Sequence, residues 1–108
     1  MDVVISRFTV HLVRLAPTVG SEMAKTRPCV VISPDEMNRQ LNTLIVAPLT
    51  STQKKYASRV QCRFAGKLGQ IALDQLRTVD RSRLVKQLGN LDASTAAKVV
   101  NTLLEMFA

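Results

Sequence analysis

The sequence predicts a mainly β domain, in which a small, strongly bent antiparallel sheet or barrel carries attached helices. Three observations support this fold class: the apolar segments are short and rich in β-branched residues, turn-forming segments separate them at close spacing, and an amphipathic helical pattern occupies the C-terminal part. The chain has 108 residues, the length of one ordinary domain, and no internal repeat or linker divides it. We therefore treat residues 1–108 as a single domain.

The first strand is predicted at residues 8–15. Its apolar residues alternate and then change phase, as they do in a strand that carries a bulge or is covered on both faces. Residues 16–26 are polar and contain Pro17 and Gly20, so we expect a mobile loop there. Loops of this length are usually functional.

A buried strand and a short helix are predicted next. Residues 29–33 form a β-branched, apolar run that is typical of a strand without a solvent face. Ser33, Pro34 and Glu36 then match the N-cap, the first residue and the capping-box glutamate of a helix. We expect this helix to end near Leu41.

In the middle of the chain, the sequence pattern predicts two strands separated by a polar loop, and a third strand after a turn. Residues 43–49 form a second buried strand, and the polar residues 50–55 cannot belong to a core. Residues 58–64 alternate between apolar and polar, as a half-solvated antiparallel strand does. Residues 65–69 indicate a turn, and residues 70–73 a short strand.

The C-terminal part predicts a capped helix. Residues 77–91 contain short elements whose type the pattern does not decide. Asp92 can cap a helix whose apolar residues recur at helical spacing. This stripe is Ala96, Val99, Val100, Leu103, Leu104 and Phe107. It packs either on the domain or on a second copy of the chain.

The charge of the chain points to a polyanionic partner. Fifteen Lys and Arg residues against eight Asp and Glu residues give a net charge of +7. Residues 91–108 carry −1, so residues 1–90 carry +8. Clustered cations bind nucleic acid because they release its condensed counterions, so we expect a nucleic-acid partner. The alternative is a positive charge that serves solubility only.

The sequence carries no sign of export or of a membrane. Nothing at the N-terminus matches a signal peptide, and the longest apolar runs fall far short of the ~20 residues that span a bilayer. Two cysteines in this length are no disulfide framework. We therefore expect a cytoplasmic protein without membrane contact, whose Cys29 and Cys62 are reduced and lie in the core.

The residue inventory excludes several chemistries. A single histidine excludes any mechanism that needs two imidazoles, and no cluster of Cys, His and carboxylate residues has the spacing of a metal site. Neither a GxGxxG nor a Walker pattern is present, so we expect no metal and no other cofactor. His11 lies at an alternating strand position, where a packed, a surface or a functional role remains open.

The remaining polar residues suit a phosphodiester. Arg, Lys, Thr, Ser, Gln and Asp residues lie on or beside the two predicted loops. RNA carries its own nucleophile in the 2′-OH, so a protein that cleaves RNA needs only to align that hydroxyl, stabilise charge on the phosphorane oxygens and help protons move. Arginine suits the stabilising role because its guanidinium can bind two phosphate oxygens at once.

Four segments in order strongly resemble the MazF/PemK family of toxin endoribonucleases. They are 18–22 (TVGSE), 25–33 (KTRPCVVIS), 47–51 (APLTS) and 69–80 (GQIALDQLRTVD). The resemblance covers most of the chain and implies an SH3-like barrel of the CcdB/PemK type, a homodimer and the toxin of a type II toxin–antitoxin system. It also implies metal-independent, sequence-selective cleavage of single-stranded mRNA to a 2′,3′-cyclic phosphate and a 5′-OH. A cognate antitoxin with an acidic tail would block the RNA groove.

The resemblance also implies roles for individual residues. Arg27, in the TRP motif, would stabilise the phosphorane and act as general acid, and Thr50 would hydrogen-bond the scissile phosphate. Glu22 matches a position that affects activity in relatives, through the orientation of Arg27. Asp74 matches a carboxylate that is proposed as the base in some relatives and as structural in others. The expected RNA contacts are Lys25, Ser51, Thr52, Lys54, Lys55 and Gln75.

The sequence departs from the family pattern at two places. Many relatives have an aromatic residue and a DPT triplet where this chain has His11 and Ala16-Pro17-Thr18, which leaves the conformation of that loop open. Some relatives carry an arginine at the position of Leu73, and its absence here leaves Arg27 alone in its role.

Two rival functions remain open. One is a non-enzymatic CcdB-like toxin that poisons DNA gyrase, although toxins of that kind place their target-binding residues on the C-terminal helix. The other is a plain nucleic-acid-binding module with a degenerate site.

Overall fold

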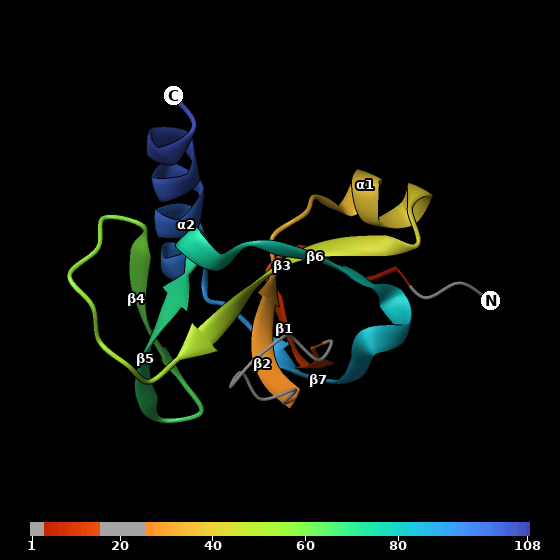
Figure 1. The fold of residues 1–108 in the computed structure, drawn as a ribbon, viewed down its shortest axis with the longest axis horizontal. Helices are drawn as coiled ribbons and strands as arrows, with labels where there is room; N and C mark the ends of the chain where they lie inside the picture. The colour runs from red at the N-terminus through yellow and green to blue at the C-terminus, as the bar shows by residue number, and fades with distance from the viewer. Residues whose placement is uncertain (1–3, 16–25) are drawn as a thin grey trace, which may run out of the picture.

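Figure 1 shows a computed structural model of the chain, which describes residues 4–15 and 26–108. The elements are β1 (Thr9–Arg14), β2 (Thr26–Val31), α1 (Asp35–Gln40), β3 (Thr43–Thr50), β4 (Arg59–Phe64), β5 (Lys67–Ala72), the 3₁₀ turn η1 (Leu73–Gln75), β6 (Arg77–Asp80), the 3₁₀ turn η2 (Arg81–Arg83), β7 (Leu84–Asn90) and α2 (Ala93–Met106). The predicted mainly β class is confirmed.

The described strands form one curled antiparallel sheet. Their order is β4-β5-β3-β2-β1-β7, and β6 pairs with β3 outside this path. Strand β3 is long enough to have two neighbours on one edge, because its first half pairs with β6 and its last two residues pair with β5. Helix α2 stands against β4, whereas α1 lies at the far end of β3 near β6 (Figure 1). The result is a bent half-barrel with a C-terminal helix.

Two apolar clusters form the core, on opposite faces of β2 and β3. Side chains alternate along a strand, so Val30 and Ala47 lie in the first cluster with residues of β4, β5 and α2. Cys29, Val31 and Val46 lie in the second cluster. The predicted run of residues 29–33 is continuously apolar because both faces of this strand are buried. Both cysteines are free and buried, as expected.

Strand β1 carries the irregularity that its sequence predicts. It pairs with β2 in an unbroken register, but its register against β7 shifts between Val10 and His11 and again between Leu12 and Val13. The predicted loop at 16–26 lies outside the described residues except for its last residue. Strand β2 begins at Thr26, three residues earlier than predicted, because the pairing with β1 continues past the apolar run. 

Helix α1 exists as predicted, but the prediction that Ser33 caps it is wrong. Pro34 is the N-cap, and no side chain caps the helix. The Ser33 hydroxyl is buried, donates a hydrogen bond to Asn38 Oδ1 (2.5 Å) and accepts one from the backbone N–H of Ile45 (3.1 Å). This hydroxyl therefore joins the helix to β3, a tertiary contact that competes with the local cap.

The β4–β5 hairpin confirms the predicted alternation. Val60 and Cys62 of β4 are buried in the first cluster. Phe64 pairs with Lys67, so the turn has two residues, Ala65 (φ 53°) and Gly66 (φ 78°), which is the positive-φ pattern of a type I′ turn. Strand β5 starts at residue 67 rather than at the predicted residue 70, because so tight a turn lets the pairing resume at once.

The C-terminal part resolves into β6, η2, β7 and α2. Asp92 is the N-cap of α2 as predicted, and its Oδ1 accepts a hydrogen bond from the backbone N–H of Thr95 (2.7 Å). Val99 is buried in the core, whereas Leu104 and Phe107 are 64% and 72% exposed. Only part of the predicted stripe packs on the domain. No helix in the described part of the chain has the length and hydrophobicity of a membrane span.

Candidate nucleic-acid interface

The sheet register brings Arg27 and Thr50 to corresponding positions. Cys29 pairs with Pro48 in the ladder between β2 and β3. Arg27 and Thr50 each lie two residues beyond this pair, so their side chains lie on the same face at this end of the two strands. Both residues belong to strands, whereas the sequence predicted Thr50 in the loop at 50–55 and left Arg27 between the loop at 16–26 and the strand at 29–33. Arg27 is exposed and Thr50 is half-buried, so both side chains are accessible to a ligand.

This face continues onto β5 and β4. Thr50 pairs with Gln70, and Gln70 pairs with Gln61, so the three side chains project to one side of the sheet. The other side of β4 and β5 packs into the first apolar cluster. We call this surface the polar face; it comprises Arg27, Thr50, Arg59, Gln61, Arg63 and Gln70.

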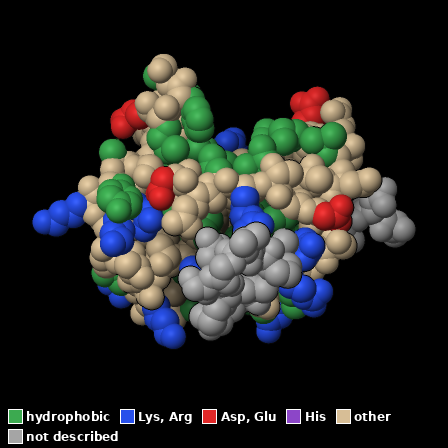
Figure 2. Space-filling model, in the orientation of Figure 1, with side chains coloured by type: hydrophobic (Ala, Val, Ile, Leu, Met, Phe, Trp, Pro, Cys, Tyr) green, Lys and Arg blue, Asp and Glu red, His purple; other side chains and the backbone are tan. Residues whose placement is uncertain are grey.

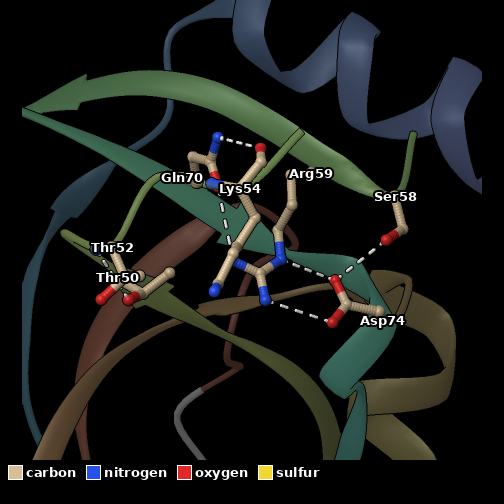
Figure 3. Close-up of polar contacts among 7 residues, drawn as sticks. All are labelled: Thr50, Thr52, Lys54, Ser58, Arg59, Gln70 and Asp74. Atoms are coloured by element: carbon tan, nitrogen blue, oxygen red, sulfur yellow. Dashed lines mark hydrogen bonds and ion pairs between the residues drawn. The ribbon is translucent and has the colours of Figure 1, made fainter. Parts of the chain in front are cut away.

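The Gln70 side chain anchors the loop that follows β3 (Figure 3). Gln70 is 1% exposed. Its Oε1 accepts a hydrogen bond from the backbone N–H of Lys54 (3.1 Å), and its Nε2 donates one to the carbonyl oxygen of Lys54 (2.9 Å). The side chain thus pairs with the loop as a neighbouring strand would. The loop carries four of the predicted RNA contacts, Ser51, Thr52, Lys54 and Lys55, all exposed.

The Thr50 hydroxyl is oriented by the same loop. Its Oγ1 accepts a hydrogen bond from the backbone N–H of Thr52 (3.1 Å). A hydroxyl that accepts one bond still has its own hydrogen to donate. Thr50 can therefore donate to an anionic oxygen without losing its position.

Arg59 holds Asp74 in a two-point ion pair (Figure 3). Arg59 Nε lies 2.7 Å from Asp74 Oδ1, and Nη2 lies 3.3 Å from Oδ2. Ser58 Oγ donates to the same Oδ1 (2.9 Å), and Arg59 Nη1 donates to Gln70 Oε1 (3.3 Å). The Arg59 side chain is 6% exposed and that of Asp74 32%. The hydrogen bond from Arg59 is the first cause of the lowered pKa of Asp74.

Sequence reasoning missed the roles of Arg59 and Gln70. The alternation of residues 58–64 placed Arg59 on the solvent side, and that side is correct, but the guanidinium is covered by its ion pair. An exposed tyrosine adds to this cover, because Arg59 Cζ lies 5.2 Å from the centroid of the Tyr56 ring. No local pattern could have revealed these contacts, since the pair joins residues 15 apart through the β4–β5 register.

The other predicted site residues lie apart or outside the described chain. Gln75 is exposed in η1 beside Asp74. Glu22, Lys25 and Ala16 lie outside the described residues. His11 is 5% exposed, and burial lowers its pKa. Its Nε2 lies 2.9 Å from Thr9 Oγ1, which makes it a packed histidine. Within residues 4–15 and 26–108, no three His, Cys, Asp or Glu side chains gather as metal ligands would.

Positive charge surrounds the polar face. In Figure 2, Lys and Arg side chains spread over the lower part of the molecule, on the β4–β5 hairpin and along the opposite flank, whereas acidic side chains are few and separate. An apolar pocket of about 500 Å³ opens beside Thr50 and Ser51. Leu49, Phe64 and Leu88 are among its walls. Because Leu49 and Phe64 pack against the first apolar cluster, the pocket opens on the other side of the sheet from Arg27, and Thr50 and Ser51 border it at the strand end. Cationic groups and a nearby apolar pocket suit a ligand that has both phosphates and bases.

Comparison with known proteins agrees with this geometry. A family model described as PemK-like, MazF-like toxin of type II toxin–antitoxin system matches residues 6–107. The chain is 33% identical over 106 residues to endoribonuclease EndoA of Bacillus subtilis (strain 168), covering 93% of this chain and 91% of the relative. It is 35% identical over 105 residues to endoribonuclease MazF of Staphylococcus epidermidis, with 92% and 88% covered.

Solved structures show the same fold. MazF from Deinococcus radiodurans aligns with a TM-score of 0.80 at 29% identity and covers 98% of both chains. A MazE–MazF structure from the same organism aligns with a TM-score of 0.81 at 28% identity, over 98% of this chain and 97% of the other. The chain therefore belongs to the family of PemK-like, MazF-like toxins of type II toxin–antitoxin systems.

Proposed function

We propose that this toxin is a sequence-selective endoribonuclease that cleaves single-stranded mRNA without a metal ion and so inhibits translation and growth. The observation that carries the proposal is the sheet register that puts Arg27 and Thr50 on one face, two residues past the Cys29–Pro48 pair. Relatives named endoribonucleases, at 33% and 35% identity, support it.

In this mechanism the 2′-oxygen of the RNA attacks the adjacent phosphorus while the bond from phosphorus to O5′ breaks. The 2′-OH gives its proton to solvent water, O5′ gains one from the protein, and the products are a 2′,3′-cyclic phosphate and a 5′-OH. Arg27 binds the phosphorane oxygens, where its positive charge stabilises the transition state more than the ground state. As general acid it transfers a guanidinium proton to O5′ as that bond breaks, and solvent restores the proton before the next turnover. Thr50 donates its hydroxyl hydrogen to the scissile phosphate. 

We assign Asp74 a positioning role rather than that of a base. Its two carboxylate oxygens already accept hydrogen bonds from Arg59 and Ser58. The lowered pKa makes its carboxylate a weaker proton acceptor. Asp74 instead fixes Arg59, and through Gln70 the loop beside Thr50.

The substrate is single-stranded because the site offers a place for an unpaired base. The lysines of the loop, Lys54 and Lys55, are exposed and track the RNA backbone, with Ser51, Thr52 and Gln75 as further contacts. The apolar pocket beside Thr50 can accept a base that has left its stack, which a duplex does not present. The remaining predicted contact, Lys25, and the predicted support of Arg27 by Glu22 stay part of the proposal.

The proposed partners follow the family. A cognate antitoxin inhibits the toxin by covering the polar face with an acidic tail; the MazF of Deinococcus radiodurans is described in a structure together with MazE. We also propose a homodimer, since Leu104 and Phe107 of α2 leave apolar surface exposed. The site of action is the cytoplasm, where mRNA is translated.

The decisive experiment incubates the purified protein with a mixed pool of single-stranded RNA in EDTA. We expect fragments with 5′-OH ends, and sequencing those ends gives the recognition site. Arg27→Ala should abolish cleavage and leave the thermal transition nearly unchanged, since Arg27 is exposed. Full activity of that variant contradicts the mechanism. Intact RNA together with inhibited gyrase favours the CcdB-like alternative, and salt-sensitive binding without products favours a plain binding module.

A further inference from the structure

A second arginine, Arg77, shares the face of the sheet that carries Arg27. Arg77 of β6 pairs with Val46 of β3, and Val46 also pairs with Val31 of β2 on its other edge. Directly paired residues of antiparallel strands project to the same side, so these three side chains lie on one face. Along β2 that face continues from Val31 through Cys29 to Arg27.

Cys29 shares this face with both arginines, because it lies on β2 between Arg27 and Val31, the residue at the level of Arg77. Burial raises the pKa of its thiol to about 11, and the charges of Arg77 and Arg27 both act in the opposite direction. Both charges are therefore close enough to influence one buried atom. The cluster around that atom is dry, since Cys29, Val31 and Val46 are 0% exposed. An apolar wall of this kind strengthens the interaction of nearby cations with an anion.

Neither arginine is neutralised within the described part of the chain. The side chains of Arg27 and Arg77 make no hydrogen bond or ion pair with the described residues. Two described carboxylates flank Arg77 in the sequence, and both have other partners: Asp74 binds Arg59, and Asp80, which pairs with Thr43 at the far end of β3, accepts from the backbone N–H of Ser82. Two cations on one face, with no described carboxylate bound to either of them, favour an anionic ligand.

We propose that Arg77 is a second phosphate-binding arginine of the RNA site, which holds a backbone phosphate other than the one that Arg27 binds. This inference rests on the proposed function and extends the site across β3 to β6. Strands β2 and β6 flank β3, so the two arginines are two strand spacings, about 9.5 Å, apart in one direction. Four residues of strand, about 13 Å, separate their levels along β2. This separation suits different phosphates of one strand rather than the same one.

Arg77 lies in the matched segment 69–80, but the sequence pattern assigned it no role. The missing arginine at Leu73 left Arg27 as the arginine of the mechanism. Strand β6 brings a second arginine to this face from the other edge of β3, with which it pairs after η1. Arg77 contributes to binding rather than to the chemical step, so its loss should raise KM and leave kcat nearly unchanged.

The test measures binding of a single-stranded RNA with a 2′-deoxy residue at the cleavage position, which cannot react, at several salt concentrations. We expect Arg77→Gln to weaken binding about tenfold and to reduce the salt slope by about one. Arg39→Gln is the matched control, since it removes the same charge from the exposed last turn of α1. It should leave affinity and slope close to wild type.

Cleavage kinetics on the ribose substrate complete the test. Arg77→Gln should show the KM increase with a kcat near that of wild type. Arg77→Lys retains the charge but loses the guanidinium fork, and it should keep the salt slope while binding more weakly. This variant also serves if Arg77→Gln does not fold by circular dichroism.

The outcomes separate this inference from the proposed function. If the wild type cleaves RNA and Arg77→Gln binds as Arg39→Gln does, the inference is wrong and the proposed function stands. The same conclusion follows if Arg77→Gln does not fold and Arg77→Lys binds as tightly as the wild type. If the wild type itself neither binds nor cleaves RNA, both fail.

Discussion

Arg59 and Asp74 form a two-point ion pair, with Nε 2.7 Å from Oδ1 and Nη2 3.3 Å from Oδ2. The pair connects β4 to the 3₁₀ turn that follows β5. Asp74 is the described carboxylate for which the family resemblance allows two roles, a catalytic base or a structural group, and the ion pair engages both of its oxygens. The same guanidinium contacts Gln70, which holds the backbone of Lys54. A single ion pair thus supports the loop on which most of the described RNA contacts lie.

The variant Asp74→Asn distinguishes a base from a positioning residue. An asparagine keeps an oxygen for Arg59 Nε but cannot accept a proton at catalytic pH. We expect this variant to keep most of its kcat and the shape of its kcat–pH profile. Asp74→Ala should be less stable by about 1.5–3 kcal/mol, because it leaves a largely covered guanidinium without its acceptor. An Asn variant that lacks the acidic limb of the profile would make Asp74 the base.

The pH dependence of stability should report the same contact. The folded-state pKa of Asp74 is lowered, first by the hydrogen bond from Arg59. The contact stabilises the fold fully above the unfolded pKa of about 3.9, and this contribution disappears as pH falls through the folded pKa. Urea unfolding at a series of pH values from 6 to about 2 should show a smaller decline for Asp74→Asn than for the wild type. Parallel curves would contradict this account.

Gln70→Leu tests the loop anchor. The substitution removes both hydrogen bonds to Lys54, and we expect about 1–3 kcal/mol less stability. The loop should then be cleaved faster in limited proteolysis. Because the loop carries predicted RNA contacts, KM should rise more than kcat falls. Gln61→Leu is the control on the neighbouring strand, since Gln61 is exposed and, among the described residues, its side chain hydrogen-bonds only to Gln53. Equal proteolysis of the two variants would show that Gln70 does not anchor the loop.

The β4–β5 turn offers a stabilising substitution. Ala65 has a φ of 53°, in the left-handed region that costs an alanine about 1–2 kcal/mol. Asn tolerates this conformation, and Asn-Gly is the preferred type I′ sequence. Ala65→Asn should therefore raise the free energy of unfolding by several tenths to about 1 kcal/mol. Gly66→Ala should lower it, because Gly66 has a φ of 78° although its Cβ would meet open space. Thermal denaturation of both variants checks the signs.

A side chain introduced at Gly69 should displace the backbone of Thr50. A Cβ at Gly69 would lie 3.1 Å from the carbonyl oxygen of Thr50, which is backbone and cannot rotate away. A Cβ at Gly89 would lie 3.2 Å from the Phe64 ring, a similar approach to a side chain. We expect Gly69→Ala to reduce kcat more than Gly89→Ala at comparable thermal stability. If Gly89→Ala reduces kcat more than Gly69→Ala does, the position of the Thr50 backbone does not matter for cleavage.

Local patterns in the sequence predicted the elements that local interactions stabilise. The alternation of residues 58–64 and the Asp92 cap of α2 needed only neighbouring residues, and both are confirmed. The prediction from Ser33 failed because its hydroxyl prefers a tertiary partner, Ile45 N–H, to the local cap. Family motifs singled out Arg27 and Thr50 without showing why they belong together.

The sequence by itself determined which residues can be buried, where the chain turns, and which side chains can bind a phosphate. Only the tertiary structure decided which of them meet. The contacts of Arg59 with Asp74 and of Gln70 with Lys54 depend on strand register, as does the place of Arg77 on the face that carries Cys29 and Arg27. A shift of one residue would turn each side chain to the other face. Register depends on the packing of both core clusters at once, so it is a property of the whole fold rather than of any segment.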